Sequence, residues 1–250
     1  MAKGVDEAGR RLFSRYAHAP NSLGYCGPAD SAALRAVACG GGDPGLVPGL
    51  AAGFSGAWPY QELIAAMTGR ADPLAADVVR AYWTGNDLTA EVDRADFGAA
   101  LLDRFGPQAA SYWTHLDESV LVEAAPTHAF HVFSIYPWTR LLGTGRPEPL
   151  EVLDSCRIAQ AEVVEVGPEQ LVVRSRHLEY RDRRLSLGEP VESRVEYLTG
   201  GGSFLGEVSP GDRVALHWGF ACDLLTSSDA AHLQRWTDWQ LDAVAPRLSA

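Results

Sequence analysis

The hydrophobic pattern of the chain changes at about residue 150, and this change restricts the possible folds more than any other feature of the sequence. Before it, apolar residues recur at helical spacing in four segments, 29–38, 60–67, 74–83 and 90–105. After it, β-branched residues dominate four short segments, 163–166, 171–173, 191–198 and 214–218. The first part is therefore predicted to be α-helical and the second to be a small barrel of short strands.

A stretch rich in turn-forming residues at 143–149 separates the two regions. We therefore expect an α+β fold, with an α-helical domain over residues 1–150 and a β domain over residues 151–250. A helix is predicted to end the chain, because capping residues at 226–229 precede apolar residues at helical spacing. Trp239 falls outside that apolar stripe. We expect it to pack against the β domain, although an exposed tryptophan could instead anchor a protein partner.

The composition disfavours several classes of function. The chain is 46% hydrophobic and carries a formal charge of −11, which is typical of a globular protein and unfavourable for binding nucleic-acid phosphates. The first residues lack the apolar core of a signal peptide, and the longest apolar stretch, 214–222, is too short to cross a bilayer. We therefore expect a cytoplasmic protein with no nucleic-acid or membrane partner, in which the four cysteines are free thiols.

Cys26 is a candidate nucleophile. It lies in the sequence Gly-Tyr-Cys-Gly-Pro, just before the helix predicted to start at residue 29. At that place the helix dipole would lower the pKa of the thiol and favour the thiolate. The simpler alternative, which we favour, is a small buried thiol in a turn. Cys39 and Cys222 have no comparable context and are interpreted as packing residues.

His128 and His131 lie three residues apart, so on a helix they would share a face and could offer two imidazoles to one metal ion. The spacing identifies no further ligand, and a closed metal site needs more than two. We therefore favour two hydrogen-bonded structural histidines over a metal site at this position. The sequence motifs of nucleotide-binding loops, serine hydrolases and zinc proteases do not occur.

Cys156 leads into the first segment of the β region, and His217 lies near the end of the last. In 213–218, bulky apolar residues occupy alternate positions, which places His217 on the opposite face of the predicted strand. His217 is therefore poorly placed for core packing. A histidine near a thiol can lower the thiol pKa, donate a hydrogen bond to sulfur or bind the same metal ion.

These two segments resemble the HypC/HupF family of NiFe-hydrogenase maturation chaperones. Members have a cysteine that runs into a strand containing Val-Val-Glu, as at 156–166 here, and a later Gly-Asp-x-Val-x-x-His-x-Gly-Phe-Ala segment, as at 211–221. The resemblance covers about residues 156–245. It implies an OB-like β-barrel with a C-terminal helix, in which Cys156 holds iron bearing cyanide and carbonyl ligands and His217 is its neighbour. It also implies that the partners are a hydrogenase large-subunit precursor or the maturation scaffold protein.

The whole chain is also similar to an actinobacterial protein family of unknown function. The likeness includes the segments Tyr-Cys-Gly-Pro-Ala-Asp at 25–30 and His-Ala-Phe-His at 128–131. We therefore expect a two-domain accessory protein or chaperone, rather than an enzyme, that handles a hydrogenase-type metal centre through Cys156 and His217. His128 and His131 would complete the site if the helical domain covers the barrel. The alternatives are an enzyme in which a histidine activates Cys26 or Cys156 as a nucleophile, and a structural interaction module that binds through Trp239.

Overall fold

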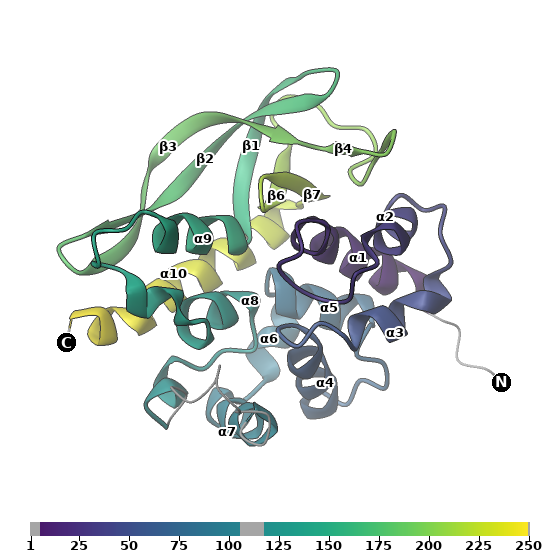
Figure 1. Ribbon diagram of the computed structural model, residues 1–250. Helices are drawn as coiled ribbons and strands as arrows, with labels where there is room; N and C mark the ends of the chain where they lie inside the picture. Colours follow the sequence, from purple (N-terminus) through teal and green to yellow (C-terminus); the bar gives the residue numbers. More distant parts are fainter. Residues whose placement is uncertain (1–5, 106–117, 250) are drawn as a thin grey trace.

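The chain forms a mixed structure of helices and strands, in a computed structural model that describes residues 6–105 and 118–249 (Figure 1). The helices before the sheet are α1 (Glu7–Ser22), α2 (Ser31–Ala38), α3 (Val47–Ala51), α4 (Trp58–Met67), α5 (Ala76–Trp83), α6 (Asp87–Glu91), α7 (Arg94–Phe105), α8 (His128–Phe130) and α9 (Glu148–Cys156). Short helical turns are η1 (Pro44–Leu46), η3 (Glu118–Glu123), η4 (His131–Ile135) and η5 (Pro137–Leu141). The strands are β1 (Ala159–Val166), β2 (Gln170–Arg181), β3 (Arg184–Glu196), β4 (Leu198–Thr199), β5 (Gly202–Ser203), β6 (Arg213–His217) and β7 (Phe220–Leu224). The C-terminal helix α10 (Ser227–Ser249) follows them, as the sequence predicted.

The predicted helices are present, with shifted ends. The segment 90–105 belongs to two helices, because Val92 is extended between α6 and α7. Helix α1 was not predicted as a separate element, and Pro20 lies inside it. It is stabilised at its start by Asp6, whose carboxylate accepts a hydrogen bond from the N–H of Gly9 at 2.9 Å and another from the N–H of Ala76 at 2.9 Å. Asp6 therefore caps α1 and also ties it to the first turn of α5.

Strands β1, β2, β3, β7 and β6 form a sheet whose strand order closes on itself, because β1 pairs with both β2 and β6. The closure is completed where β3 meets β7 at the single pair Glu196 and Phe220. One face of the strands encloses an apolar cluster that includes Val163, Leu171 and Val214. The expected start of the β region near residue 150 was too early, because α9 occupies that segment and β1 begins at Ala159.

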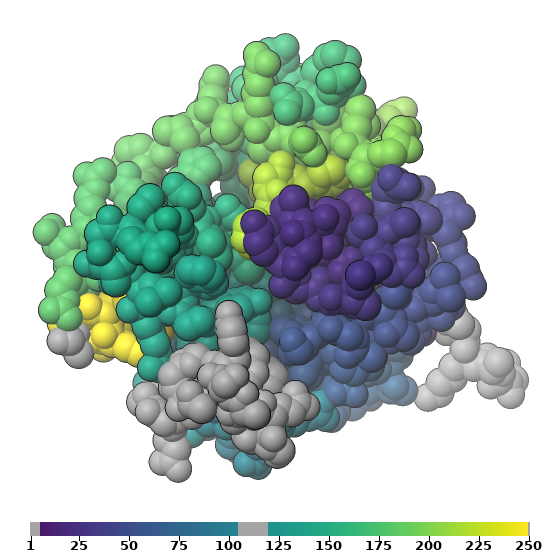
Figure 2. All heavy atoms as spheres, in the orientation of Figure 1, coloured from purple at the N-terminus to yellow at the C-terminus, as the bar shows by residue number. Residues whose placement is uncertain are grey.

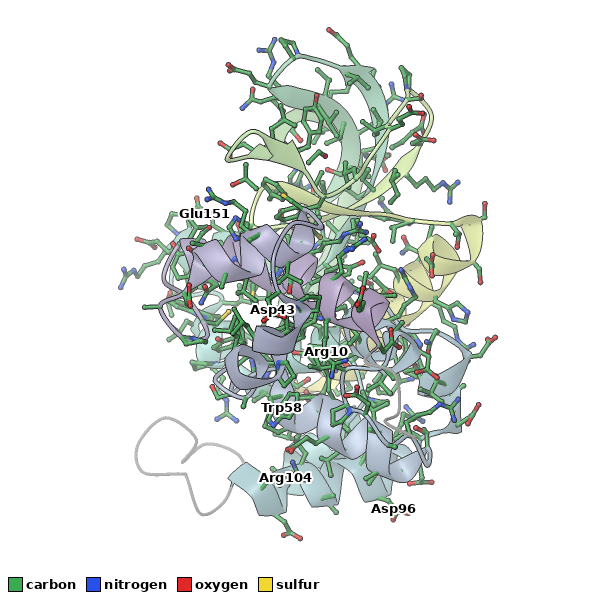
Figure 3. All side chains as sticks on the ribbon, turned by 90° about the vertical axis from the view of Figure 1, so that its right-hand side faces the viewer. Arg10, Asp43, Trp58, Asp96, Arg104 and Glu151 are labelled. Atoms are coloured by element: carbon green, nitrogen blue, oxygen red, sulfur yellow. The ribbon has the colours of Figure 1, made fainter. Side chains whose placement is uncertain are left out.

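The helices and the sheet share one hydrophobic core. The largest buried cluster contains side chains of α1, α4 and α5 together with Ala215, Phe220 and Cys222 from β6 and β7. Helix α1 lies directly against β6 and β7, as the purple and yellow-green surfaces show in Figure 2. A second view shows the strands at one end of the molecule and the helical elements marked by Arg10 and Trp58 below them (Figure 3). Helix α1 therefore lies beside the end of β6.

Candidate metal centre

A cavity of about 170 Å³ lies where α1, the loop after α1, α8, α9 and the turn between β6 and β7 meet. Its wall is mostly aromatic or aliphatic. The cysteine and histidine side chains that line it are Cys26, His128, His131, Cys156 and His217. Among the described residues, no Asp, Glu, Lys or Arg contributes to the wall. Five of the seven cysteines and histidines that the sequence analysis named thus line one apolar cavity, although they come from the loop after α1 and from α8, η4, α9 and β6.

Two features of the backbone bring Cys156 and His217 together. Cys156 is the last residue of α9, and His217 is the last residue of β6. Trp218 and Gly219 form the two-residue turn to β7 with φ values of 52° and 73°, as a tight hairpin requires. The N–H of Trp218 donates a hydrogen bond of 2.8 Å to the carbonyl oxygen of Ser155, which is one of the unpaired carbonyls at the end of α9. The tip of the hairpin is therefore fixed to the end of the helix that carries Cys156.

His128, Cys156 and His217 form a compact group of possible metal ligands. One ligand atom from each of the three lies within 4.8 Å of the other two. The rings of His128 and His217 are 5.3 Å apart between centroids and nearly perpendicular. Two imidazoles and one thiol are a typical donor set for zinc or for iron(II), because a thiolate is a soft ligand and imidazole suits both ions. The residues present therefore fit a divalent transition-metal ion.

The tautomer of His217 supports this interpretation. Its Nδ1 lies 2.8 Å from the carbonyl oxygen of Tyr16, and since a carbonyl can only accept, Nδ1 carries the proton. Nε2 is then left with a lone pair, and it is buried without a hydrogen-bond partner in the described structure. The residue is 2% exposed. A histidine that donates from one nitrogen to a backbone carbonyl and presents the other to a cavity is the usual arrangement of a metal ligand.

The three polar contacts around His128 and Tyr82 need one more proton than these two side chains supply in their neutral forms. Nε2 of His128 lies 2.8 Å from the carbonyl oxygen of Cys156, Nδ1 lies 2.9 Å from the hydroxyl of Tyr82, and that hydroxyl lies 2.6 Å from the carbonyl oxygen of Gly56. These three contacts need three protons, whereas neutral His128 and Tyr82 supply two. The imidazolium form is disfavoured, because burial and the neighbouring His217 hold the pKa of His128 well below its usual range. A metal ion at Nε2 would take the place of the contact with the Cys156 carbonyl, and the ring proton on Nδ1 would then donate to Tyr82, so that the two remaining contacts need only the two protons present.

The thiols of the cavity are protonated near neutral pH without such an ion. Burial raises the pKa of Cys156 to about 12, the nearby Cys26 adds to the rise, and the indole N–H of Trp218 partly opposes it. Burial also raises the pKa of Cys26 to about 12. Burial lowers the pKa of His217 to about 4, which keeps its imidazole neutral and able to bind a metal. A metal ion would replace the Cys156 proton, as in other thiolate sites.

The structure corrects the hypothesis of an activated Cys26. Helix α2 begins at Ser31 and is capped by Asp30, so Cys26 lies in the loop before it and not at its first turn. The helix dipole falls off within one turn, and burial raises the pKa of the thiol instead of lowering it. The favoured alternative, a thiol enclosed in a Gly/Pro turn, describes its partly buried position. Cys39 is exposed and Cys222 is buried beside Ala215.

His131 lies next to the group of three ligands but not within it. The rings of His128 and His131 are 6.1 Å apart and nearly parallel, so the two residues do share a face as predicted. Nδ1 of His131 lies 3.1 Å from the hydroxyl of Tyr60, and burial lowers the pKa of His131 to about 3. Of the two histidines that we expected to complete the site of Cys156 and His217, His128 lies in the group of possible ligands and His131 lies beside it.

Trp239 does not pack against the β domain, and that expectation was wrong. It lies half-buried on α10 beside Trp236, and the guanidinium of Arg94 at the start of α7 lies 4.4 Å from the centre of its ring. A cation over a tryptophan ring is a stabilising contact within the molecule. The contact between Trp239 and Arg94 thus joins α10 to α7.

Tyr82 and Trp218 are site residues that the sequence analysis missed. Tyr82 lies inside a predicted helix, where the sequence pattern indicates only an aromatic residue of the hydrophobic core. Trp218 was assigned to the apolar face of a strand, whereas the strand ends one residue earlier and Trp218 turns over the cavity, where Tyr25 stacks on it at 4.1 Å. Gly219, directly after it, is the sequence signal for a turn at this place, because tight hairpin turns need positive φ and glycine adopts it readily.

The chain belongs to a family of unknown function, DUF6390, whose model matches residues 5–250. The comparison with curated proteins and that with solved structures found no match. None of the helices in the described part of the chain has the length and hydropathy needed to span a bilayer.

Proposed function

We propose that this protein is an accessory protein that holds a divalent transition-metal ion through Cys156, His128 and His217. The observation that carries the proposal is the unpartnered Nε2 of His217, buried at 2% exposure and opposite a thiol and a second imidazole within 4.8 Å. Leaving such a nitrogen unpaired costs about 1–3 kcal/mol, which a bound ion would recover. The apolar wall of the cavity would exclude water and competing ligands from the ion.

The finer part of the proposal follows from the resemblance to the HypC/HupF family. The sheet would be an OB-like barrel, and the ion would be iron with cyanide and carbonyl ligands, carried as cargo for a NiFe-hydrogenase large-subunit precursor or taken from the maturation scaffold. Two features support this reading. The strand order β1-β2-β3-β7-β6 closes and is followed by one helix, and the resembling segments bring Cys156 and His217 to one cavity. The protein would then act in the cytoplasm as a chaperone.

The raised thiol pKa values argue against the alternative of a cysteine nucleophile. A nucleophilic cysteine needs a substantial thiolate fraction, and a pKa of about 12 leaves almost none near neutral pH. The interaction module that would bind through Trp239 has less support, because the ring is already covered on one side by Arg94. Metal handling therefore fits the site best.

Anaerobic purification followed by metal analysis tests the coarser proposal. Wild-type protein is expected to bind one equivalent of Fe²⁺ or Zn²⁺, and both Cys156→Ser and His217→Gln are expected to weaken binding at least about a hundredfold, since even groups that only orient metal ligands contribute 10–100-fold. Cys39→Ser, which removes an exposed thiol outside the cavity, is the matched control. Unchanged affinity in Cys156→Ser would rule out the metal site.

Infrared spectroscopy in the cyanide and carbonyl stretching region tests the finer proposal. Protein co-expressed with hydrogenase maturation genes is expected to show such bands and bound iron, both lost in Cys156→Ala. Iron or zinc binding without these bands, although the maturation proteins are present, would retain the metal site and reject the hydrogenase cargo.

A further inference from the structure

Cys26 is a thiol of the cavity that the three-ligand site does not use. It lies in the loop 23–30 between α1 and α2 and lines the same cavity as Cys156. The two thiols are close enough for each charge to affect the other, because Cys26 is among the causes that raise the pKa of Cys156. The sulfur of Cys26 nevertheless does not belong to the group of ligand atoms from His128, Cys156 and His217 that lie within 4.8 Å of one another.

The three-ligand group is one ligand short of a closed site. Zinc and iron(II) with thiolate ligands are usually four-coordinate and tetrahedral. On the wall of the cavity, the described residues offer His131 and Cys26 as the remaining nitrogen or sulfur donors. The Nδ1 of His131 lies 3.1 Å from the hydroxyl of Tyr60, and its Nε2 packs against Gly56, where an added Cβ would lie only 2.5 Å from that nitrogen. Cys26 is therefore the donor that could complete the set.

The loop that carries Cys26 lies over the cavity and has a defined conformation. Gly24 and Gly27 flank the Tyr25-Cys26 pair, and both have a φ of 77°, a conformation that suits glycine. Asn21 fixes the base of the loop, because its Nδ2 donates hydrogen bonds of 2.7 and 2.6 Å to the carbonyl oxygens of Cys26 and Pro28. The side chain of Tyr25 is 59% exposed and covers Trp218 from the outside. The loop is thus anchored at its base and covers the cavity with the residue next to Cys26.

We propose that Cys26 moves in to supply a second thiolate, so that the loaded centre has two cysteine and two histidine ligands and the loop 23–30 closes over it. This inference rests on the metal site of the proposed function and adds its fourth ligand. Beside the position of Cys26 on the cavity wall, it is supported by the buried, unpartnered Nε2 of His217, which lines the same cavity and offers a lone pair to an ion there. The ligand class is a divalent ion that prefers a tetrahedral sulfur and nitrogen set, such as Zn²⁺, Fe²⁺ or Co²⁺.

Cobalt spectroscopy on the full chain tests the assignment. Thiolate-to-cobalt absorption in the near ultraviolet increases with the number of bound thiolates, so Cys26→Ser is expected to retain about half of the wild-type intensity and to bind Co²⁺ about tenfold more weakly. Cys39→Ser is expected to match the wild type. Equal intensity and affinity in Cys26→Ser and wild type would overturn the role of Cys26. If Co²⁺ binding is lost in Cys156→Ser at the same time, the proposed function still stands.

Alkylation of the wild-type protein gives a second test that needs no substitution. Co²⁺ is expected to slow the reaction of iodoacetamide with both Cys26 and Cys156 and to leave Cys39 unaffected. Mass spectrometry of the peptides identifies each thiol. Protection of Cys156 alone would contradict a fourth ligand from the loop, whereas protection of neither cysteine, with no Co²⁺ bound, would contradict the metal site itself.

Discussion

Lowering the pH from about 7.5 to about 5.5 is expected to reduce the free energy of unfolding of the metal-free protein by about 4 kcal/mol. The cause is the set of three buried histidines around the cavity. Burial lowers the pKa of His131 to about 3 and that of His217 to about 4, and it holds the pKa of His128 well below its usual range. A loss of this size is a large share of the stability of a typical protein, which is about 5–15 kcal/mol.

The direction of the effect follows from the two protonation states. Above pH 6.5 the three imidazoles are neutral in both the folded and the unfolded chain, so the full stability is present. Below pH 6.5 the unfolded chain takes up protons that the folded chain refuses, and each histidine then costs about 1.4 kcal/mol per pH unit until its folded pKa is reached. Asp223 acts in the opposite direction, because burial raises its pKa in the folded state. The three histidines outweigh this single carboxyl.

Urea unfolding at several pH values, in the presence of a chelator, measures the effect. His131→Gln is the informative variant, since it removes one of the three titrating groups and lies outside the group of metal ligands. It is expected to be less stable than wild type at neutral pH but to lose about one third less stability on acidification. Equal free energies of unfolding at the two pH values in the wild type would contradict the buried neutral state of these histidines.

The sequence predicted the elements better than their contacts. Helical and alternating patterns located most of the helices and strands, because these patterns depend on residues that are neighbours in the chain. The start of α9 was missed, since a Gly/Pro-rich stretch that reads as a connector runs directly into its first turn. The shared core between α1 and strands β6 and β7 was also not predictable, because no local pattern specifies which apolar face meets another.

The candidate site shows the same limit in more detail. Each of its cysteine and histidine residues was identified from the sequence, by its neighbours or by a resemblance. Their grouping was expected only from the resemblance and on the condition that the helical domain covers the barrel, because it depends on the hydrogen bond from Trp218 to Ser155 and on the carbonyl of Tyr16, both of which join distant elements. For Cys26, the argument from the helix dipole likewise gave a lowered pKa, whereas burial raises the pKa of this thiol to about 12. Local sequence indicates a helix terminus or a nearby histidine, whereas burial by several elements decides the pKa.

Asp223→Ala is expected to lower the free energy of unfolding by about 1–3 kcal/mol, because it removes the buried acceptor of Arg15 and leaves Arg80 with Asp229 as its remaining carboxylate partner in the described structure. Asp223 is 3% exposed and lies on β7. Its Oδ1 accepts from Arg15 at 3.0 Å, and its Oδ2 accepts from Arg80 at 3.2 Å and from the hydroxyl of Tyr16 at 3.3 Å. These partners belong to α1 and α5, so the carboxylate joins the sheet to two helices of the helical region.

Asp242→Ala is the matched control, because the carboxylate of Asp242 is 78% exposed and lies 3.8 Å from Arg184. Exposed pairs of this kind contribute less than about 1 kcal/mol, so urea unfolding should separate the two variants clearly. A change below about 1 kcal/mol in Asp223→Ala as well would show that the buried pair adds nothing to the free energy of unfolding.

Asp223 also supports the candidate metal site, since it accepts a hydrogen bond from Tyr16, and the carbonyl of Tyr16 orients His217. Asp223→Asn is therefore expected to weaken Co²⁺ binding by about tenfold, as loss of a group that supports a ligand does, while Asp242→Ala leaves it unchanged.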